Sequence, residues 1–243
     1  MDETTSFGGR TVIVTGASSG IGRETAIALA DGDANVVLAA RREERLRTIA
    51  DDLETQTLVV PTDVTDETAV ASLVETTVEE FGSIDVLVNN AGLARGSGVS
   101  GLSTEQYREM MAVNTDGMFF LTREALPHLV DSGGHLIFIG SFAGQYPRPF
   151  NPVYAATKWW TRGFAKSVSA DVGDEDVAVT VINPSEVRTE FGSEDGTAFE
   201  EQFEEGEVTE PEEIASAVVF AAGQDDSMVS EMDLYRRDKF DFF

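Results

Sequence analysis

A tyrosine and a lysine four residues apart are the side chains in this sequence best suited to chemistry. Tyr154 and Lys158 stand in the segment YAATK, and on a helix this spacing places both side chains on one face. A tyrosine hydroxyl has an unperturbed pKa of about 10, and a nearby ammonium group lowers it by favouring tyrosinate. The pair can therefore exchange a proton with a carbonyl or alcohol oxygen. The same spacing also occurs as a plain surface pair, but lysine is scarce here, because Lys166 and Lys239 are the only others.

Two further polar residues precede this pair. Ser141 ends an apolar segment and comes 13 residues before Tyr154, and its hydroxyl is able to orient and polarise a substrate oxygen. Asn114 follows apolar residues in MMAVN. An asparagine in such surroundings needs a hydrogen-bond partner, and the alternative is a core amide satisfied by backbone groups.

The glycine-rich segment TGASSGIG, residues 15–22, follows an apolar run and opens an amphipathic stretch. Glycines permit a tight turn and a close approach of phosphate to the backbone, and the N-terminus of the following helix binds anions. The segment predicts a dinucleotide site that includes Gly16, Ser18, Ser19, Gly20, Ile21 and Gly22.

The same segment also fits G-x-S-x-G, the nucleophile elbow of serine hydrolases. That elbow normally lies deep in a sheet with several strands before it, whereas here only one apolar run precedes the segment. The histidine partner would have to be His128 or His135, and neither follows a late strand. A serine hydrolase is therefore the least favoured alternative.

Two arginines indicate which dinucleotide is bound. Arg41 and Arg42 follow the apolar run NVVLAA, at the place where an NAD site carries a carboxylate for the ribose 2′-hydroxyl. A guanidinium binds a 2′-phosphate instead. The alternative is that both arginines pair with Glu43 and Glu44, but cations at a helix N-terminus oppose the helix dipole. The sequence therefore predicts NADP(H) over NAD(H).

Apolar runs alternate with amphipathic stretches along the chain. The short β-branched runs predict buried strands at 11–15, 35–40, 58–61, 84–89, 135–140 and 177–183. Helices are predicted at 20–31, 42–54, 65–82, 103–131 and 152–173, with Pro127 marking a turn or kink in the fourth, whose length suggests two helices. This alternation predicts an α/β fold, a single Rossmann-type domain over 1–243 with a doubly wound parallel sheet of about seven strands.

Two segments lie outside that alternation. Residues 190–210 are acidic and interrupted by glycines, which fits a solvated loop or, as favoured by their place after an inner strand, a lid over the site. Residues 228–234 alternate like a last strand and lead into a C-terminal tail that ends at 243.

Together, Thr-Gly-x-x-x-Gly-x-Gly and Tyr-x-x-x-Lys resemble the short-chain dehydrogenase/reductase family, and the likeness covers nearly all of residues 10–235. It implies a tetrad of Asn114, Ser141, Tyr154 and Lys158, with Asn114 supporting a water-linked proton relay and Lys158 also holding the nicotinamide ribose. The resemblance further implies cofactor contacts from Asp63, Val64, Asn90, Ala91, Gly92, Pro184, Val187 and Thr189. Ser185 departs from the family pattern, which usually has glycine there.

The leading hypothesis is an NADP(H)-dependent oxidoreductase that transfers hydride between nicotinamide and a small carbonyl or alcohol substrate. No metal is expected, because Tyr154 and Ser141 supply the polarisation that a zinc ion would give. The alternative is a cofactor-binding regulatory protein without turnover, which only Ser185 supports. Residues 140–144 and the last strand look like the NADP-dependent 3-hydroxy acid (serine-type) dehydrogenase branch.

The sequence leaves the substrate open and favours an oligomer. Arginines bordering the expected pocket could clamp a carboxylate, although pairing with surface acids is favoured; they are Arg95, Arg148 and Arg188. Aromatic residues there could form an apolar pocket or belong to the core; they are Phe142, Tyr146, Phe150 and Phe191. The family resemblance implies a homodimer or homotetramer through 103–131 and 152–173. The contact could use Trp159 and Trp160, which could also pack on their own sheet, together with Phe240, Phe242 and Phe243.

The charge of the chain excludes several partners. With 17 basic and 44 acidic residues the net charge is −27, which disfavours nucleic acid and anionic membranes. There is no cysteine, so disulfides and thiolate chemistry are excluded. The absence of a long apolar run and of a signal-peptide pattern predicts a cytoplasmic protein. The acid-rich, lysine-poor composition resembles that of proteins from salt-accumulating microbes, in which salt screens self-repulsion.

Overall fold

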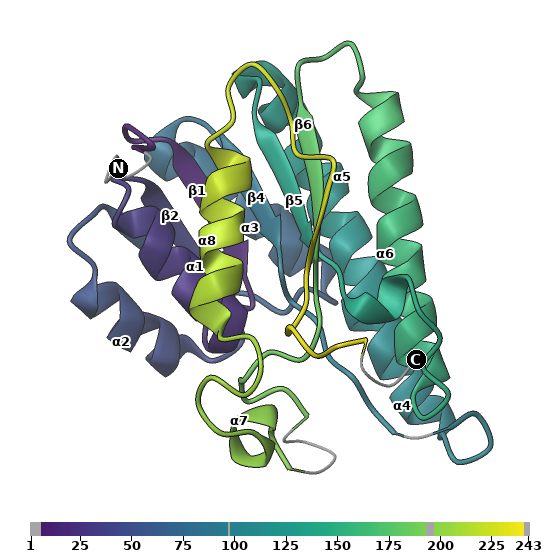
Figure 1. The fold of residues 1–243 in the computed structure, drawn as a ribbon. Coiled ribbons are helices and arrows are strands. Elements are labelled where there is room, and N and C mark those ends of the chain that lie inside the picture. The colour runs from purple at the N-terminus through teal and green to yellow at the C-terminus, as the bar shows by residue number, and fades with distance from the viewer. Residues whose placement is uncertain (1–5, 97, 193–196, 241–243) are drawn as a thin grey trace.

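The computed structural model describes residues 6–96, 98–192 and 197–240. One sheet of seven parallel strands forms its centre, in the order β3-β2-β1-β4-β5-β6-β7 (Figure 1). The strands are β1 (Thr11–Thr15), β2 (Asn35–Ala40), β3 (Thr57–Pro61), β4 (Val86–Asn89), β5 (His135–Ile139), β6 (Ala178–Pro184) and β7 (Glu231–Leu234). The predicted doubly wound parallel sheet is therefore confirmed.

Helices cover both faces of the sheet. Their bounds are α1 (Gly20–Ala30), α2 (Glu43–Asp52), α3 (Glu67–Phe81), α4 (Thr104–Met111), α5 (Met118–Ser132), α6 (Pro152–Asp171), α7 (Phe199–Gln202) and α8 (Pro211–Ala222). Buried side chains of α1, α2 and α8 form the core on one face, and those of α3, α5 and α6 form the core on the other. The inner strands are apolar on successive residues because both of their faces are covered in this way.

The carboxyl ends of all seven strands meet at one edge of the sheet, because the strands are parallel. Ligands bind at this edge in open α/β sheets. Several predicted site residues come just after strands: Gly16 after β1, Arg41 after β2, Asn90 after β4, and Ser141 two residues after β5. The fold therefore gathers distant segments of the sequence at a single edge.

The predicted fourth helix is divided, but not at Pro127. A π-helical stretch, η1 (Ala112–Gly117), separates α4 from α5, and α5 continues through Pro127 to Ser132. A π-helical stretch inserts an extra residue into a helix and is frequent at functional sites. Here it carries Asn114, whose side chain hydrogen-bonds outside its own helix.

The C-terminal third differs most from the predicted elements. Helix α8 was not predicted, although Pro211 at its first turn followed by Glu212 and Glu213 is a typical helix start. Strand β7 is shorter than the predicted 228–234. The predicted lid falls partly on 193–196, and Phe242 and Phe243 also lie outside the described residues. Within the described ranges, no helix combines the length and the apolar character needed to cross a membrane.

Candidate active site

A cavity of about 350 Å³ opens at the carboxyl edge of the sheet. Residues predicted for cofactor and substrate line it from both halves of the sheet, and of all predicted site residues only Gly22 and Asn114 are not among its lining. Phe191 and Phe199, before and on α7, also line the cavity. The described part of the predicted lid segment therefore borders the site.

The glycine loop forms a cradle for a ligand, and it has no room for side chains at Gly16 and Gly20. Gly16 and Gly20 have φ values of +66° and +53°, where residues with a Cβ are strained. A Cβ on Gly20 would lie 2.9 Å from the methyl group of Thr189. Ser19, at the N-cap of α1, makes no side-chain cap, and the first turn of the helix has no acidic residue. The backbone N–H groups of the first turn of α1 are therefore not capped by a side chain. They suit a pyrophosphate, which a helix N-terminus binds readily.

Thr15 and Asn90 brace this loop against β4. The Asn90 side chain donates to the carbonyl of Thr15 at 2.7 Å, and the backbone N–H groups of Asn90 and Ala91 donate to the Thr15 hydroxyl at 3.0 and 3.1 Å. A Cβ on Gly16 would lie 2.8 Å from the Asn90 amide nitrogen. The turn after β4 and the glycine loop are therefore fixed to each other.

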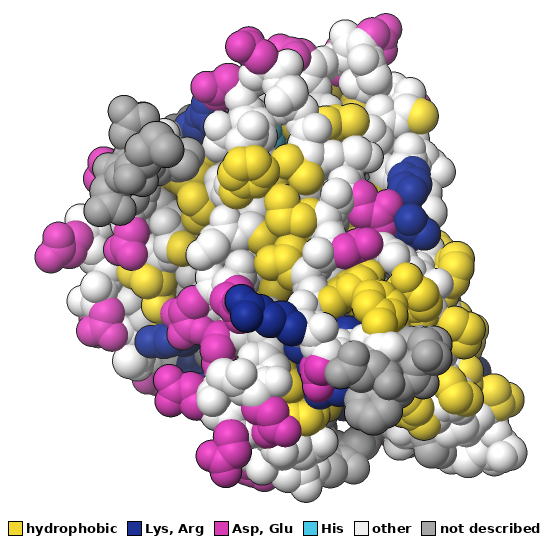
Figure 2. All heavy atoms as spheres, viewed as in Figure 1, with side chains coloured by type: hydrophobic (Ala, Val, Ile, Leu, Met, Phe, Trp, Pro, Cys, Tyr) yellow, Lys and Arg dark blue, Asp and Glu magenta, His cyan; other side chains and the backbone are white. Residues whose placement is uncertain are grey.

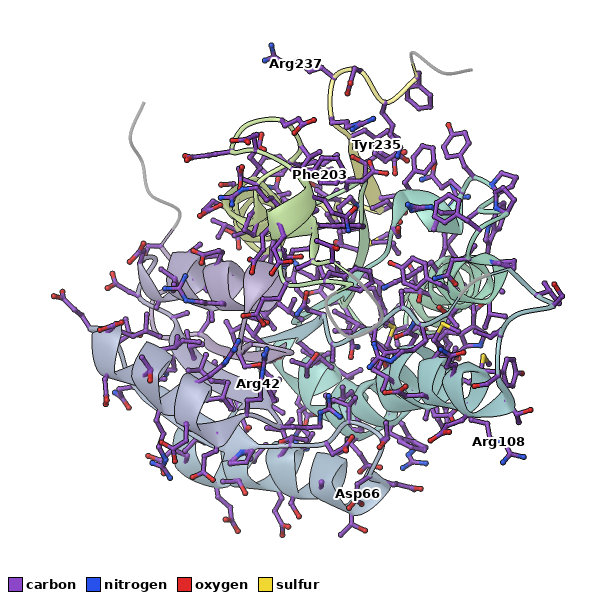
Figure 3. All side chains as sticks on the ribbon, turned by 90° about the horizontal axis from the view of Figure 1, so that it is seen from below. Arg42, Asp66, Arg108, Phe203, Tyr235 and Arg237 are labelled. Atoms are coloured by element: carbon purple, nitrogen blue, oxygen red, sulfur yellow. The ribbon has the colours of Figure 1, made fainter. Side chains whose placement is uncertain are left out.

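The guanidinium of Arg42 spans the mouth of the glycine loop, near the centre of the view in Figure 3. It donates to the hydroxyls of Ser18 and Ser19 at 3.0 and 2.7 Å and to Glu190 at 2.9 Å. Arg45 binds the same Glu190 carboxylate at 2.6 Å. Burial alone would raise the pKa of Glu190, but the hydrogen bonds from Arg42 and Arg45 outweigh it, so the pKa is lowered. The position predicted to take a 2′-phosphate therefore holds a carboxylate of this chain.

Arg41 and Asp63 line the neighbouring part of the cavity. The Asp63 carboxylate accepts from the backbone N–H and the hydroxyl of Thr65 at 3.0 and 2.8 Å. Burial raises the pKa of Asp63, but these hydrogen bonds and the charge of Arg41 together lower it below its usual value. Val64 is buried and packs against Gly117. A Cβ on Gly117 would lie 2.9 Å from the Val64 side chain, so no larger residue fits at position 117.

Tyr154 and Lys158 are both buried on α6, with 9% and 4% of their surfaces exposed. The Lys158 ammonium donates to the carbonyl of Ile139 at 2.8 Å and lies 5.9 Å from the centre of the Tyr154 ring. Burial lowers the pKa of Lys158 to about 8. It raises the pKa of Tyr154, although a hydrogen bond with Ser141 and the charge of Arg148 act in the opposite direction. In this structure, burial outweighs any electrostatic activation of the tyrosine.

Ser141 and Asn114 complete the predicted tetrad from two other elements. Ser141 caps a short 3₁₀ turn, η2 (Phe142–Gly144), and its hydroxyl accepts from the N–H of Ala143 at 3.1 Å. The fully buried Asn114 side chain accepts from the N–H of Leu93 at 2.9 Å and donates to the Leu93 carbonyl at 2.8 Å. It also donates to the Thr157 hydroxyl, beside Lys158, at 3.0 Å. Asn114 thus joins the segment after β4 to α6.

Serine is accommodated at position 185, after β6, because its backbone and its hydroxyl both form hydrogen bonds. The N–H of Ser185 donates to the carbonyl of Leu234 at 3.0 Å, and its hydroxyl accepts from the N–H of Arg236 at 3.0 Å. Ser185 therefore ties the cavity wall to the C-terminal tail. Pro184, Val187 and Thr189 line the cavity on either side of it.

The three arginines considered as substrate clamps have different surroundings. Arg95 donates to both oxygens of Glu109 at 2.9 and 3.0 Å, and Arg188 donates to Glu210 at 2.9 Å. Arg95 and Arg188 therefore pair with acidic side chains, which is the interpretation that the sequence favoured. Arg148 lines the cavity, and its ion pair with Glu186 is longer, at 3.6 Å.

The aromatic residues separate into two groups. Phe191 lines the cavity and contacts the Tyr154 ring with centroids 5.8 Å apart. Phe142 stacks on Tyr146 with centroids 4.3 Å apart, and Tyr235 and Phe240 of the tail close over them. Phe150 is 64% exposed. Trp160 is partly buried and stacks on Phe164 against the core of its own sheet face, whereas Trp159 is 49% exposed.

Sequence reasoning missed Asn183 and Glu190. Asn183 is fully buried near the end of β6 and contacts Ser141, Glu231 and Asp233. Its position beside Pro184 at the end of an apolar run was a detectable signal. The role of Glu190 had no signal of its own, because it is one of many acidic residues in an acidic segment.

The chain is similar in sequence to known proteins. Residues 10–198 match the family model described as short chain dehydrogenase. The chain is 35% identical, over 87% of its length and 88% of the relative, to the NADP-dependent 3-hydroxy acid dehydrogenase YdfG of Salmonella typhi.

Two solved structures have the same fold. A serine dehydrogenase complexed with NADP⁺ has a TM-score of 0.87 and 30% identity, covering 93% of this chain and 94% of that one. A 3-ketoacyl-(acyl-carrier-protein) reductase of Brucella melitensis complexed with NADH has a TM-score of 0.87 and 27% identity, covering 95% and 98%. The match over residues 10–198 means that this chain belongs to the short chain dehydrogenase family and is an oxidoreductase.

Proposed function

We propose that this oxidoreductase uses NADP(H) to interconvert a small carbonyl compound and the corresponding alcohol. The observation that carries the proposal is the joint burial of Tyr154, Lys158 and Ser141 at the cavity that also contains the glycine cradle and Arg42. Buried titratable groups around a cavity are typical of catalytic sites.

The proposed mechanism assigns a separate task to each residue. The cofactor, when bound, supplies or accepts the hydride. The Ser141 hydroxyl orients the substrate oxygen and stabilises charge on it. Tyr154 donates its hydroxyl proton to that oxygen in reduction and removes the proton in oxidation. Lys158 lowers the pKa of Tyr154 when its ammonium is charged, and Asn114 holds the segment after β4 against α6.

NADP(H) is proposed over NAD(H) because of the groups after β2. Arg42 is bound to the Ser18 and Ser19 hydroxyls, and Arg41 lines the same cavity. This cluster of donors suits a 2′-phosphate. The name of the Salmonella relative and the NADP⁺ bound to the serine dehydrogenase agree with the proposal, whereas the Brucella reductase was solved with NADH. Fluorescence titration with NADPH and NADH tests the preference directly.

Replacing Tyr154 by phenylalanine tests the proposed chemistry. Tyr154→Phe should abolish NADPH oxidation with every accepted aldehyde or ketone, while NADPH still binds. Tyr107 on α4, which is 45% exposed, offers a matched control, and Tyr107→Phe should keep full activity. Turnover within a few fold of wild type in Tyr154→Phe would contradict the mechanism. Cofactor binding without any turnover in the wild type would instead favour the regulatory alternative.

The serine hydrolase alternative is not favoured. Ser18 lies after β1 at the carboxyl edge, whereas His135 is the first residue of β5 and therefore lies at the opposite edge of the sheet. His128 lies within α5. The Ser18 hydroxyl accepts a hydrogen bond from Arg42, whereas a nucleophilic serine would donate its proton to a histidine.

We also propose that the chain forms a homodimer or homotetramer. Phe119 on α5 and Trp159 on α6 are 41% and 49% exposed. Hydrophobic side chains also gather over and beside α8 in Figure 2, where Phe220 is 53% exposed. Exposed apolar groups of this kind mark association surfaces. Light scattering should give a multiple of the 26.2 kDa chain mass, and Trp159→Glu should shift it toward the monomer.

A further inference from the structure

Arg148 is distinguished from the other arginines at the cavity by its weak pairing. Its side chain is 16% exposed and lines the cavity. Within the described part of the chain, its guanidinium makes one ion pair, with Glu186 at 3.6 Å, and no hydrogen bond. Its planar group also lies over the Phe150 ring, 4.9 Å from the ring centre. A guanidinium has five N–H donors, so this partly buried one, with a single long ion pair, retains free donor capacity.

Glu186 does not satisfy the free N–H donors of Arg148, because its carboxylate is hydrogen-bonded by Lys239. The Lys239 ammonium donates to both oxygens of Glu186 at 2.5 and 2.7 Å, and it lies 4.3 Å from the centre of the Phe142 ring. Burial raises the pKa of Glu186, but the hydrogen bonds from Lys239 outweigh it, so the pKa is lowered. The Glu186 carboxylate is therefore already bound by Lys239 of the C-terminal tail.

Two further cations lie near Glu186 without lining the cavity, namely Arg236 and Lys239. Arg236 lies 3.9 Å from Glu186 and 3.1 Å from Asp238. Among the described residues, Arg148, Arg236 and Lys239 share the carboxylates of Glu186 and Asp238. Of these three cations only Arg148 lines the cavity, so it is the one placed to meet a ligand there.

The charge of Arg148 reaches the predicted reaction centre. The charge of Arg148 acts to lower the pKa of Tyr154, against the larger effect of burial. Arg148 also lies in the short loop between Ser141 and Tyr154 in the sequence. A molecule whose oxygen meets Tyr154 and Ser141 is therefore within reach of the guanidinium.

We propose that Arg148 binds a carboxylate on the substrate, so that the enzyme acts on short oxo acids and the corresponding hydroxy acids. The proposal rests on the proposed function. A guanidinium fork matches the two oxygens of a carboxylate and would orient the carbonyl toward Tyr154. In reduction, the carbonyl carbon gains a hydride from NADPH and its oxygen takes the Tyr154 proton. The oxo acid is thereby reduced to the hydroxy acid, and NADPH is oxidised to NADP⁺.

Acids and their esters provide the test, because esterification removes only the charge. Acetoacetate and succinic semialdehyde are compared with their methyl esters in wild type, Arg148→Gln, Arg148→Lys and Arg237→Gln. Arg237 is the control because it is exposed and points away from the protein in Figure 3. Titration calorimetry of the same acids and esters, with NADPH bound to the Tyr154→Phe variant with and without Arg148→Gln, measures binding without turnover.

The wild type and Arg237→Gln should prefer the acid in kcat/KM. Arg148→Gln should lose about tenfold or more for the acid, as expected when a charged hydrogen bond is removed. Its loss for the ester should be clearly smaller, because the ester lacks the carboxylate and is affected only through the charge of Arg148 on Tyr154. Its NADPH affinity should stay the same, and Arg148→Lys should be intermediate. Equal losses for acid and ester, or a wild type that reduces uncharged carbonyls but prefers no acid, would overturn the inference and leave the proposed function intact. A wild type that binds NADPH and reduces no carbonyl would overturn both.

Discussion

The side-chain oxygen of Asn183 accepts a hydrogen bond from the backbone N–H of Ser141 at 3.3 Å. The amide nitrogen of Asn183 donates to Glu231 and Asp233 of β7, both at 2.9 Å. The orientation of the amide is fixed because carboxylates accept only from its nitrogen. A Cβ on Gly140 would collide with the same oxygen. Asn183 therefore connects the predicted substrate-orienting serine to the last strand.

Asn183→Leu should lower kcat because Ser141 loses the acceptor that positions its backbone. We expect about a tenfold loss in kcat, with NADPH affinity unchanged, since one buried N–H is left without a partner. Steady-state kinetics and fluorescence titration separate the two effects. Asn35→Ala, at an asparagine that donates to the Gly9 carbonyl on the exposed surface, is the control. A parallel loss of cofactor binding would mean that Asn183 supports the whole fold rather than Ser141.

Glu190→Gln should tighten NADPH binding. The Glu190 carboxylate holds Arg42 and Arg45, and a 2′-phosphate bound by Arg42 must compete with it. Exposed pairs of this kind contribute about 0.2–1 kcal/mol, so the expected decrease in Kd is up to about fivefold. NADH, which lacks the phosphate, should show a smaller change. Glu201→Gln on α7 serves as the control, and weaker NADPH binding in Glu190→Gln would show that the ion pairs instead hold the cofactor.

Stability should rise with pH in the range where Lys158 titrates. Burial lowers the pKa of Lys158 from 10.5 to about 8, so the unfolded chain holds more protons above pH 8, and the free energy of unfolding increases with pH. Lys158→Met should stabilise the protein at pH 7 by up to about 3 kcal/mol and flatten this dependence. Denaturant unfolding from pH 7 to 9.5 measures both effects and stays below the range where the buried Tyr154 ionises.

Lys166→Met is the matched control for that experiment. Lys166 is half-exposed on α6 and pairs with Glu231 at 3.1 Å. Its removal should leave the pH dependence between 7 and 9.5 in place. If Lys158→Met were less stable than wild type at pH 7, the hydrogen bond from Lys158 to Ile139 would outweigh the cost of burying the charge.

Activity should increase with KCl toward molar concentrations. The acidic surface repels itself at low ionic strength, whereas at about 1 M salt the Debye length is only about 3 Å. Figure 2 shows acidic side chains spread over the visible face. Turnover and melting temperature are measured from 0.1 to 3 M KCl. Full activity and stability in dilute buffer would contradict the proposed salt adaptation.

The sequence predicted the sheet and the glycine loop well because both follow local rules. β-branched apolar runs form parallel strands, and glycines after the first strand form the cradle. Helix α8 was not predicted, because the acidic, glycine-rich stretch before it was interpreted as a loop and the start of the helix after that loop was not recognised. Contacts such as those of Asn183 with β7 and of Glu190 with Arg42 could not be predicted, because they join segments that only the folded sheet brings together. The cytoplasmic location stays a prediction.

The placement of the three lysines has a practical consequence for handling this protein. Lys158 is buried at the candidate active site and Lys239 is bound to Glu186, whereas Lys166 on α6 is half-exposed and does not line the cavity. Amine-reactive dyes, cross-linkers and immobilisation resins will therefore find one accessible lysine, and attachment through it will leave the cavity unobstructed. Because Lys158 faces the cofactor cavity, its acylation by a small reagent should in turn report whether that cavity is occupied.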